Sequence, residues 1–352
     1  MADAWMVYGA YGYTGRLVLE RAVAAGYKPV VAGRDPDRTE SLALEFGLPH
    51  RSFELSDTEA LRRGLTGMRA VLHCAGPFST TAAPMIAACL QVGTHYLDIT
   101  GEIDVFAFAH ANDSAARKRS VALVPGVGFD VVPTDCLAAL LKRELPDATE
   151  LLLAFDAQGG PSRGTALTSI EGLGKGGRIR REGELISVPL GYKRREIAFP
   201  HGNRQTVTIP WGDVYTAFVS TGIPNIEVYM ALPPRTISGL RRLRWLTPLL
   251  GLGPVQWLLK RRVEANVHGP DASRRGDSRS YVHGEVRNPR GDVRIATLST
   301  PNGYALTAEA ALKITHFLAT DAGPHAGFYT PSLLMGADFV RSLSGVEYAR
   351  VR

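Results

Sequence analysis

The feature that most constrains this chain is a run of three glycines, spaced three residues apart, directly behind an apolar segment. That segment, Ala4–Tyr8, has the apolar and aromatic composition of a short strand, and Gly9, Gly12 and Gly15 follow it. A helical pattern over 17–25 comes next and ends at another glycine. This succession of strand, tight turn and helix predicts a dinucleotide-binding fold.

Each glycine has a physical task in such a fold. The first permits the turn, the second lets the backbone approach a diphosphate, and the third lets helix and strand pack closely. The helix N-terminus adds N–H groups and the positive end of the helix dipole. The spacing is G-x-x-G-x-x-G, not the stricter G-x-G-x-x-G, so its position between strand and helix is what favours nucleotide binding over an ordinary turn. The predicted cofactor contacts here are Gly9, Tyr11, Gly12, Tyr13, Thr14 and Gly15.

The end of the second predicted strand, over 29–32, distinguishes between two cofactors. A carboxylate at this position normally holds the ribose 2′-hydroxyl of NAD, whereas an arginine accommodates the 2′-phosphate of NADP. Gly33 and Arg34 occupy the strand end, Arg38 follows one helical turn later, and Asp35 lies one residue past the usual acidic position. The sequence therefore predicts an NADPH site, with a solvated loop arginine as the alternative.

Further cofactor contacts are predicted at the ends of two later strands. Continuous apolar runs are typical of parallel strands, whose carboxyl ends form the ligand crevice of a doubly wound sheet. The run that begins at Met68 ends in small residues that permit close approach of a cofactor, with a plain loop as the alternative. The predicted contacts after these strands are Ala75, Gly76, Pro77, Phe78 and Gly126.

Polar residues near the exit of the predicted strand over 95–98 are candidate proton donors, which hydride transfer requires. Strand alternation places Tyr96, Asp98 and Glu102 on one face. Asp98 is the first catalytic candidate and Tyr96 the second, and for each the alternative is a hydrogen-bonded structural role. Asp130 is expected either to orient a nicotinamide amide or to cap the helix that follows. No metal site is predicted.

The order of elements indicates two domains. Strands and helices alternate through residue 146, as in the Rossmann doubly wound parallel α/β sheet. Beyond it, alternating runs and the hairpin signal Asn288–Gly291 indicate an α+β domain on a mostly antiparallel sheet. We expect a nucleotide-binding domain over 1–146, a second domain over 147–304, and closing helices in 305–352 that pack back on the first.

Local signals add detail to this outline. A helix is predicted over 36–46, and a capping box at Ser56–Glu59 precedes another over 58–65. A single helix is predicted over 102–119. Two closing helices are predicted over 306–319 and 331–343.

Composition excludes several classes of protein. Of the 352 residues, 45% are hydrophobic, which is enough for sizeable cores and argues against long disorder. The formal charge of +6 has no Lys/Arg block interleaved with aromatics, so nucleic acid is not an expected partner, and small anionic ligands explain the surplus. The three cysteines show no pairing pattern, no signal peptide is evident, and no apolar run reaches the ~18–20 residues of a membrane span, which indicates a cytoplasmic protein.

Two other enzyme classes deserve comparison. A thiolate at Cys136, near a predicted helix start, would suit a semialdehyde dehydrogenase. However, Cys136 shares helical spacing with Leu137, Leu140 and Leu141, which favours a core position. Short-chain reductases use a similar glycine-rich turn, but the chain contains no Tyr-x-x-x-Lys pair.

The segment 241–262 is unusual in composition. It is apolar, carries Trp245 and Trp257, is flanked by arginines, and is interrupted by Pro248 and Pro254. It is too short to span a bilayer. Contact with a membrane surface, with an acyl carrier or with an acyl chain is one interpretation, and a dimer-interface or core helix pair is the other.

Several of these motifs together resemble the saccharopine dehydrogenase-like oxidoreductases, and within them the trans-acting enoyl reductase branch. The resemblance covers nearly the whole chain and is densest in the first 135 residues. The motifs that carry it are Val7–Gly15, Ala32–Arg34, Cys74–Phe78, Tyr96–Glu102, Pro125–Asp130 and Thr330–Gly336.

The resemblance implies an NADP-binding Rossmann domain followed by a substrate-binding and dimerisation domain, and hence a homodimer. The expected activity is hydride transfer from NADPH to a C=C or C=N bond of a hydrophobic or carrier-bound substrate. A saccharopine-type amino-acid or imine dehydrogenase, and a cofactor-binding protein without activity, are the alternatives. The chain is short, so we expect it to lack the longer substrate domain of saccharopine-forming enzymes, which argues against lysine-pathway activity.

Overall fold

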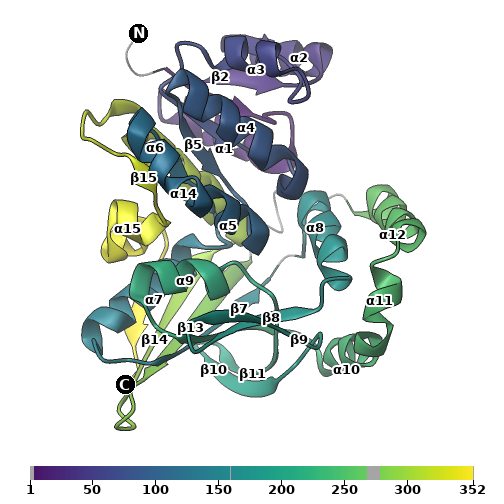
Figure 1. Cartoon of the computed structure of the whole chain (residues 1–352), viewed down its shortest axis with the longest axis vertical. Helices are drawn as coiled ribbons and strands as arrows, with labels where there is room; N and C mark the ends of the chain where they lie inside the picture. Colours follow the sequence, from purple (N-terminus) through teal and green to yellow (C-terminus); the bar gives the residue numbers. More distant parts are fainter. Residues whose placement is uncertain (1–3, 159, 268–277, 352) are drawn as a thin grey trace. The chain divides into compact units, whose positions relative to one another are not determined.

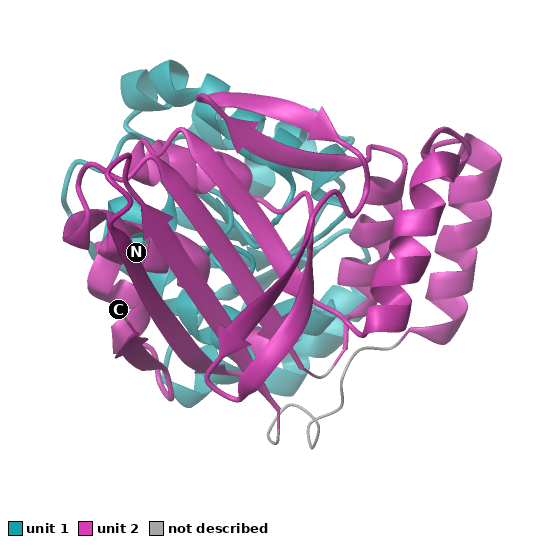
Figure 2. Ribbon diagram, turned by 90° about the horizontal axis from the view of Figure 1, so that it is seen from below, with its two compact units in different colours: residues 1–132, 304–335 teal, residues 133–303, 336–352 magenta. Residues whose placement is uncertain are grey.

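A computed structural model describes the fold over residues 4–158, 160–267 and 278–351. The chain divides into two compact units (Figure 2): unit 1 is 1–132 with 304–335, and unit 2 is 133–303 with 336–352. The chain thus passes from one unit to the other three times. This division falls at 132, where the sequence suggested 146, and it assigns 336–352 to unit 2, where the sequence suggested the first domain.

Unit 1 is built on a seven-stranded parallel sheet in the order β15-β6-β5-β4-β1-β2-β3. Its N-terminal elements are drawn in purple and blue in Figure 1. The order reverses at β1 and β4, as in a doubly wound fold, and this confirms the Rossmann prediction. The strands are β1 (Trp5–Tyr8), β2 (Val30–Gly33), β3 (His50–Ser52), β4 (Ala70–His73), β5 (His95–Asp98), β6 (Ala122–Val124) and β15 (Gly327–Phe328).

Helices accompany the strands of this sheet, and the central strands are buried along their whole length. Residues on both faces of β1 are therefore apolar, and Met6 and Val7 are both fully buried. The helices are α1 (Tyr13–Ala24), α2 (Pro36–Phe46), α3 (Thr58–Leu65), α4 (Phe78–Val92), α5 (Ile103–Ala111), α6 (Asp113–Arg119), α14 (Gly303–Thr320) and α15 (Pro331–Met335).

Two local predictions in unit 1 are wrong. Helix α3 is capped by Asp57, whose carboxylate accepts a hydrogen bond from the Ala60 N–H at 2.9 Å. The Ser56 hydroxyl, the expected cap, donates instead to Glu54 at 3.1 Å. The helix expected over 102–119 is interrupted at Asn112, where α5 ends and α6 begins.

Unit 2 is built on a nine-stranded mixed sheet with the main order β10-β11-β12-β7-β13-β14-β16, and β8 and β9 extend from β12. Among the described strands of this second sheet only the β7–β12 pairing is parallel, so the prediction of a mostly antiparallel sheet is confirmed. The strands are β7 (Glu150–Ala157), β8 (Gly177–Arg181), β9 (Glu184–Val188), β10 (Arg194–Phe199), β11 (Gly202–Thr208), β12 (Asn225–Ala231), β13 (Arg279–Arg287), β14 (Val293–Pro301) and β16 (Glu347–Arg350).

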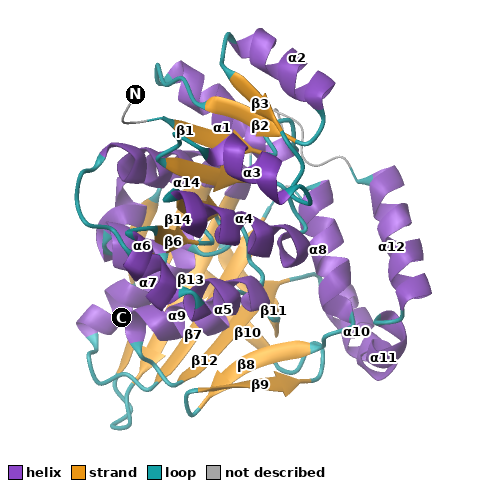
Figure 3. Cartoon of the chain, turned by 45° about the horizontal axis from the view of Figure 1, so that its top comes forward, coloured by secondary structure: helices purple, strands orange, loops and turns teal. Residues whose placement is uncertain are grey.

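Helices α8, α10, α11 and α12 of unit 2 lie together at one side of this sheet (Figure 3). Helix α7 packs on β13: a Cβ at Gly284 would lie only 2.6 Å from Leu141, so the absence of a side chain there permits the contact. The closing helix expected over 331–343 is shorter, because it ends at Met335 and a 3₁₀ turn, Ala337–Ser342, leads into β16. The helices are α7 (Val132–Glu144), α8 (Arg163–Leu173), α9 (Asp213–Thr221), α10 (Pro234–Leu243), α11 (Thr247–Leu250) and α12 (Gly253–Asn266).

Across the described ranges, no helix combines the length and the apolar composition needed to cross a bilayer.

Candidate nucleotide-binding site

The glycine-rich loop joins β1 to α1 at the carboxyl edge of the parallel sheet. Gly9 has φ +78°, and a Cβ there would lie 2.8 Å from the backbone nitrogen of Ala75, in the loop after β4. A Cβ at Gly15 would lie 2.5 Å from the carbonyl oxygen of Gly9. The two positions therefore exclude side chains for different reasons. Gly9 must adopt the turn conformation, and Gly15 must let α1 pack closely against the loop.

Helix α1 begins at Tyr13, four residues earlier than its apolar pattern suggested, with Gly12 at the N-cap position. Gly12 offers no side chain to cap the helix, and its N–H donates to the Gly9 carbonyl at 2.9 Å. The first turn of a helix presents backbone N–H groups that have no intrahelical acceptor. The loop and this first turn thus form a surface suited to a diphosphate.

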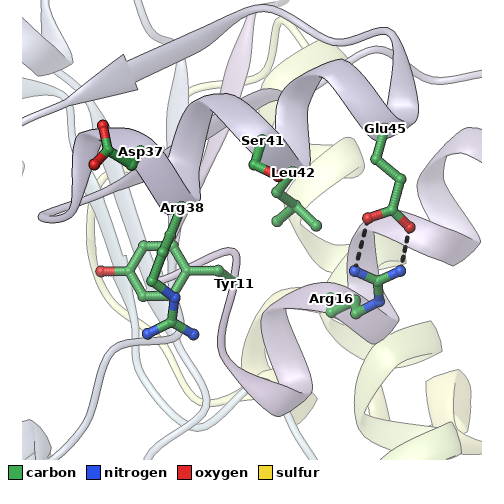
Figure 4. A pocket seen from close by; sticks show the side chains of 7 residues that line it. All are labelled: Tyr11, Arg16, Asp37, Arg38, Ser41, Leu42 and Glu45. Atoms are coloured by element: carbon green, nitrogen blue, oxygen red, sulfur yellow. Dashed lines mark hydrogen bonds and ion pairs between the residues drawn. The ribbon is translucent and has the colours of Figure 1, made fainter.

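Beside the loop lies a shallow pocket of about 360 Å³ (Figure 4). The guanidinium of Arg38 stacks over the Tyr11 ring, 4.3 Å from its centroid. At the other end of the pocket, Arg16 forms a two-pronged ion pair with Glu45. The lining residues are Tyr11, Arg16, Asp37, Arg38, Ser41, Leu42 and Glu45.

The charges at the end of β2 favour a phosphate over a ribose hydroxyl. The Asp35 carboxylate caps α2 by accepting a hydrogen bond from the Arg38 N–H at 3.1 Å, so it is occupied in holding the helix. Arg34 is exposed, and neither Arg34 nor Arg38 forms an ion pair within the described ranges. Two guanidinium groups without carboxylate partners are thus available where NADP carries its 2′-phosphate.

The loop after β4 is held by side chains from neighbouring segments. The Phe78 N–H, at the start of α4, donates to the Glu102 carboxylate at 3.0 Å. The Thr81 hydroxyl donates to the Ala75 carbonyl at 2.7 Å. Gly76 is exposed and Pro77 half-buried, so this stretch borders the loop of Gly9 with its backbone accessible.

Tyr96 and Asp98, the predicted catalytic pair, are fully buried at the end of β5. The Tyr96 hydroxyl donates to Asp98 Oδ2 at 2.6 Å, and Asp98 Oδ1 accepts from the N–H groups of Thr100 and Gly126, both at 2.9 Å. Burial raises the pKa of Asp98 to about 6, and the three donors oppose that rise. This arrangement favours a structural role for Asp98 over a catalytic one, because its carboxylate links the end of β5 to the turn that follows β6.

Gly126 occupies a position different from the other predicted cofactor contacts. It is buried with φ +76°, and a Cβ there would lie 2.8 Å from the Phe106 ring and from the Val131 side chain. Its N–H is used by Asp98. Gly126 therefore shapes the interior of unit 1, and nothing in its surroundings supports direct contact with a cofactor.

Replacement of Asp98 separates its structural role from a catalytic one. Asp98→Ala leaves three donors without an acceptor, and we expect the free energy of unfolding in urea to fall by about 3 kcal/mol. Asp98→Asn retains an acceptor for the two N–H groups, and its amide can donate to the Tyr96 hydroxyl, so a change within about 1 kcal/mol is expected. A thousandfold loss of turnover in Asp98→Asn at unchanged stability would instead support a role as proton donor.

Asp130, expected either to orient a nicotinamide amide or to cap the next helix, is a further candidate proton donor. It lies in the segment that follows the Gly126 turn and is partly buried, and a Cβ at Gly101 would lie 3.2 Å from its Oδ2. Burial raises the pKa of its carboxyl to about 7. A carboxyl group that retains its proton near neutral pH, at the carboxyl edge of the sheet, has the properties of a general acid.

The rival thiolate at Cys136 does not fit its surroundings. Cys136 is fully buried in α7, and burial together with the nearby Asp135 carboxylate raises the pKa of its thiol well above the ordinary value. A nucleophilic cysteine needs a lowered pKa and access to a substrate. Cys136 is therefore a core residue, as its helical spacing suggested.

Comparison with known proteins agrees with this geometry. Residues 5–124 match the family model of the saccharopine dehydrogenase NADP binding domain. A probable mitochondrial saccharopine dehydrogenase-like oxidoreductase of Arabidopsis thaliana is 33% identical over 147 residues, which are 37% of this chain and 32% of that protein. A trans-acting enoyl reductase of Mycobacterium tuberculosis is 29% identical over 166 residues, which are 43% of this chain and 38% of that protein.

A saccharopine dehydrogenase-like oxidoreductase of Mus musculus is 28% identical over 205 residues, 50% of this chain and 47% of that protein. The matches thus span about a third to a half of the curated relatives. Among solved structures, the saccharopine dehydrogenase (L-Glu forming) of Saccharomyces cerevisiae superposes with a TM-score of 0.68 at 12% identity, covering 99% of this chain and 100% of that one. Because the superposition covers nearly all of both chains, the expectation that this chain lacks the longer substrate domain of saccharopine-forming enzymes is wrong with respect to that enzyme.

Proposed function

We propose that the chain is an NADPH-dependent oxidoreductase, because residues 5–124 match the family model of the saccharopine dehydrogenase NADP binding domain. It delivers a hydride to a C=C or C=N bond of a hydrophobic or carrier-bound substrate. The observation that carries the cofactor assignment is the pair Arg34 and Arg38 at the end of β2, where Asp35 is occupied in capping α2. A C=C substrate is supported by the enoyl reductases among the relatives.

In this proposal different residues of unit 1 bind the cofactor and supply the proton. Arg34 and Arg38 bind the 2′-phosphate, and the backbone from Gly9 to Gly15 binds the diphosphate. The nicotinamide, when bound, supplies the hydride. Asp130 holds the proton that the reduced product requires, because its raised pKa leaves a substantial fraction of the carboxyl protonated at neutral pH.

A substrate panel tests the proposed reaction. Purified protein is mixed with NADPH and either an α,β-unsaturated acyl thioester of short or long chain, or a cyclic imine, and the loss of NADPH fluorescence is followed. We expect turnover with enoyl thioesters and a preference for the longer chain. The Arg34→Ala/Arg38→Ala variant is the matched control and should lose most of the rate at limiting NADPH.

The same panel discriminates between the alternatives. Turnover with imines alone would favour an imine or amino-acid dehydrogenase. Tight NADPH binding without turnover on any substrate would favour a cofactor-binding protein that lacks activity. Failure to bind NADPH in a calorimetric titration would contradict the proposal altogether.

A further inference from the structure

A helical segment of unit 2 exposes an uncommon concentration of large apolar side chains. This segment, residues 234–266, comprises α10, the 3₁₀ turn Arg244–Leu246, α11 and α12, and we call it the basic arm (Figure 3). Of the eleven exposed large hydrophobic residues in the described ranges, seven belong to it. They are Leu243, Trp245, Leu246, Leu249, Leu252, Trp257 and Leu258, with exposed fractions from 37% to 77%.

The basic arm also carries the whole positive surplus of the protein. It holds seven of the chain's 40 Lys and Arg residues but only one of its 34 Asp and Glu residues, so the rest of the chain has 33 of each. The net charge of +6 is therefore that of the arm alone. Its basic residues are Arg235, Arg241, Arg242, Arg244, Lys260, Arg261 and Arg262.

Most of these charges form no ion pair with another residue that the structure describes. Lys260 pairs with Glu171 of α8 at 2.5 Å, but none of the six arginines forms an ion pair with another described residue. Two of them lie over the exposed tryptophans instead: Arg244 is 5.0 Å from the Trp245 ring centroid, and Arg261 is 5.2 Å from that of Trp257. Each tryptophan thus stands beside a cation that is free to contact an anion.

Polar and backbone contacts hold the basic arm in place, and its large apolar side chains stay exposed. The Gln256 amide donates to the carbonyls of Ile170 and Leu250, at 2.9 and 2.6 Å. A Cβ at Gly174 would lie 2.6 Å from the Gly251 Cα, so the backbones at the ends of α8 and α11 are in close contact. Helix α12 buries no residue, and α10 buries only Ile237.

We propose that the basic arm docks on an anionic phospholipid surface. Tryptophan and leucine side chains enter the boundary between headgroups and acyl chains, and the arginines contact lipid phosphates, as in helices that lie in a membrane interface. Charge favours this occupant over a second copy of the chain, because a two-fold interface would place the same positive surface against itself. The proposal is independent of the reaction, since lipid binding requires no turnover.

Flotation with phospholipid vesicles tests the proposal on the full-length protein. We expect the protein to float with phosphatidylcholine vesicles that contain phosphatidylglycerol, more weakly with phosphatidylcholine alone, and less as salt increases. Trp245→Ala/Trp257→Ala should reduce the partition coefficient at least tenfold. Arg241→Glu/Arg242→Glu/Arg261→Glu/Arg262→Glu should reduce binding to the anionic vesicles about a hundredfold or more.

Matched controls replace side chains of the same kinds outside the arm. Leu44→Ala/Leu333→Ala removes exposed leucines, and Lys118→Glu/Arg119→Glu reverses exposed charges, and both should float like the wild type. An unchanged affinity for NADPH shows that each variant is folded. Equal flotation of the arm variants and the wild type would overturn the proposal.

Two further outcomes would also overturn it. If the wild type ignores both vesicle types but sediments as a dimer that the tryptophan variant loses, the arm is an interface between copies. If the wild type ignores vesicles but binds an acidic acyl-carrier protein through the same arginines, the arm is a protein-docking surface.

Discussion

Replacing Arg34 and Arg38 together by alanine is expected to weaken NADPH binding about a hundredfold or more and to leave NADH binding nearly unchanged. A hydrogen bond to a charged group contributes about 1.5–3 kcal/mol, so Arg34→Ala alone should cost roughly ten- to a hundredfold. Only NADPH carries the 2′-phosphate that these guanidinium groups would contact. Asp35 cannot substitute for them in recognising NADH, because its carboxylate caps α2.

Calorimetric titrations of both cofactors at one fixed salt concentration measure this effect. The fragments 2′,5′-ADP and 5′-ADP, titrated in the same way, isolate the contribution of the phosphate. Arg63→Ala, which removes an exposed arginine from α3, is the control for a general loss of positive charge. Equal weakening of both cofactors in the double variant would refute the phosphate assignment and with it the choice of NADPH.

The Asp130→Asn variant should lose about a hundred- to ten-thousandfold in kcat while retaining its affinity for NADPH. An amide resembles the carboxyl in size and polarity but has no proton to deliver at neutral pH. Asp104→Asn, at an exposed position in the first turn of α5, is the matched control and should retain activity. A wild-type kcat in Asp130→Asn would exclude this residue as the proton donor.

The pH dependence provides a second readout for Asp130. The pKa of its carboxyl is about 7, so the wild-type rate of reduction should fall as the pH rises above 7, because the acid form is lost. The free energy of unfolding should also depend on the protonation of Asp130. The folded state binds the Asp130 proton more tightly than the unfolded state, so the free energy of unfolding falls as the pH rises from the ordinary carboxyl pKa to about 7. Both trends should be weaker in Asp130→Asn.

Much of unit 1 could be predicted from sequence because capping and helix-breaking residues mark the ends of several of its helices. The predicted limits of α2 are those observed, since Asp35 and Pro36 mark its start and Gly47 adopts the left-handed conformation at its end. The interruption between α5 and α6 has no marker as strong: Asn112 is neither glycine nor proline, and a helix interior tolerates it. The start of α1 was also missed. Its first turn lies against the glycine-rich loop and not against an apolar core, so no apolar periodicity marks it.

In unit 2 the hairpin of β8 and β9 escaped prediction. Both strands are only five residues long, and β8 is rich in arginine and glycine, so the alternation of apolar and polar residues is weak there. Glu182 and Gly183, both with positive φ, form the turn and were the available signal. Pairing with β12, which is distant in sequence, is what stabilises this hairpin.

In the candidate site, too, contacts between residues close in sequence could be predicted, and contacts between residues far apart in sequence could not. Strand alternation correctly indicated that Tyr96 and Asp98 share a face, and they are hydrogen-bonded at 2.6 Å. That Asp98 also binds the N–H of Gly126, 28 residues later in the chain, depends on the pairing of β5 with β6 and could not be read locally. The Asp35 cap, by contrast, was readable from the following proline, and would have strengthened the NADPH assignment at once.

The last strand of the parallel sheet, β15, pairs with β6 although some two hundred residues separate them in the chain. During synthesis the ribosome therefore releases every described strand of the second sheet except β16 before it releases the segment that pairs with the free edge of β6. A fragment cut at residue 132 would leave that edge unpaired, and exposed edges of this kind invite aggregation. Expression of the nucleotide-binding half in isolation thus requires a short linker from residue 132 to residue 304, in place of a simple truncation.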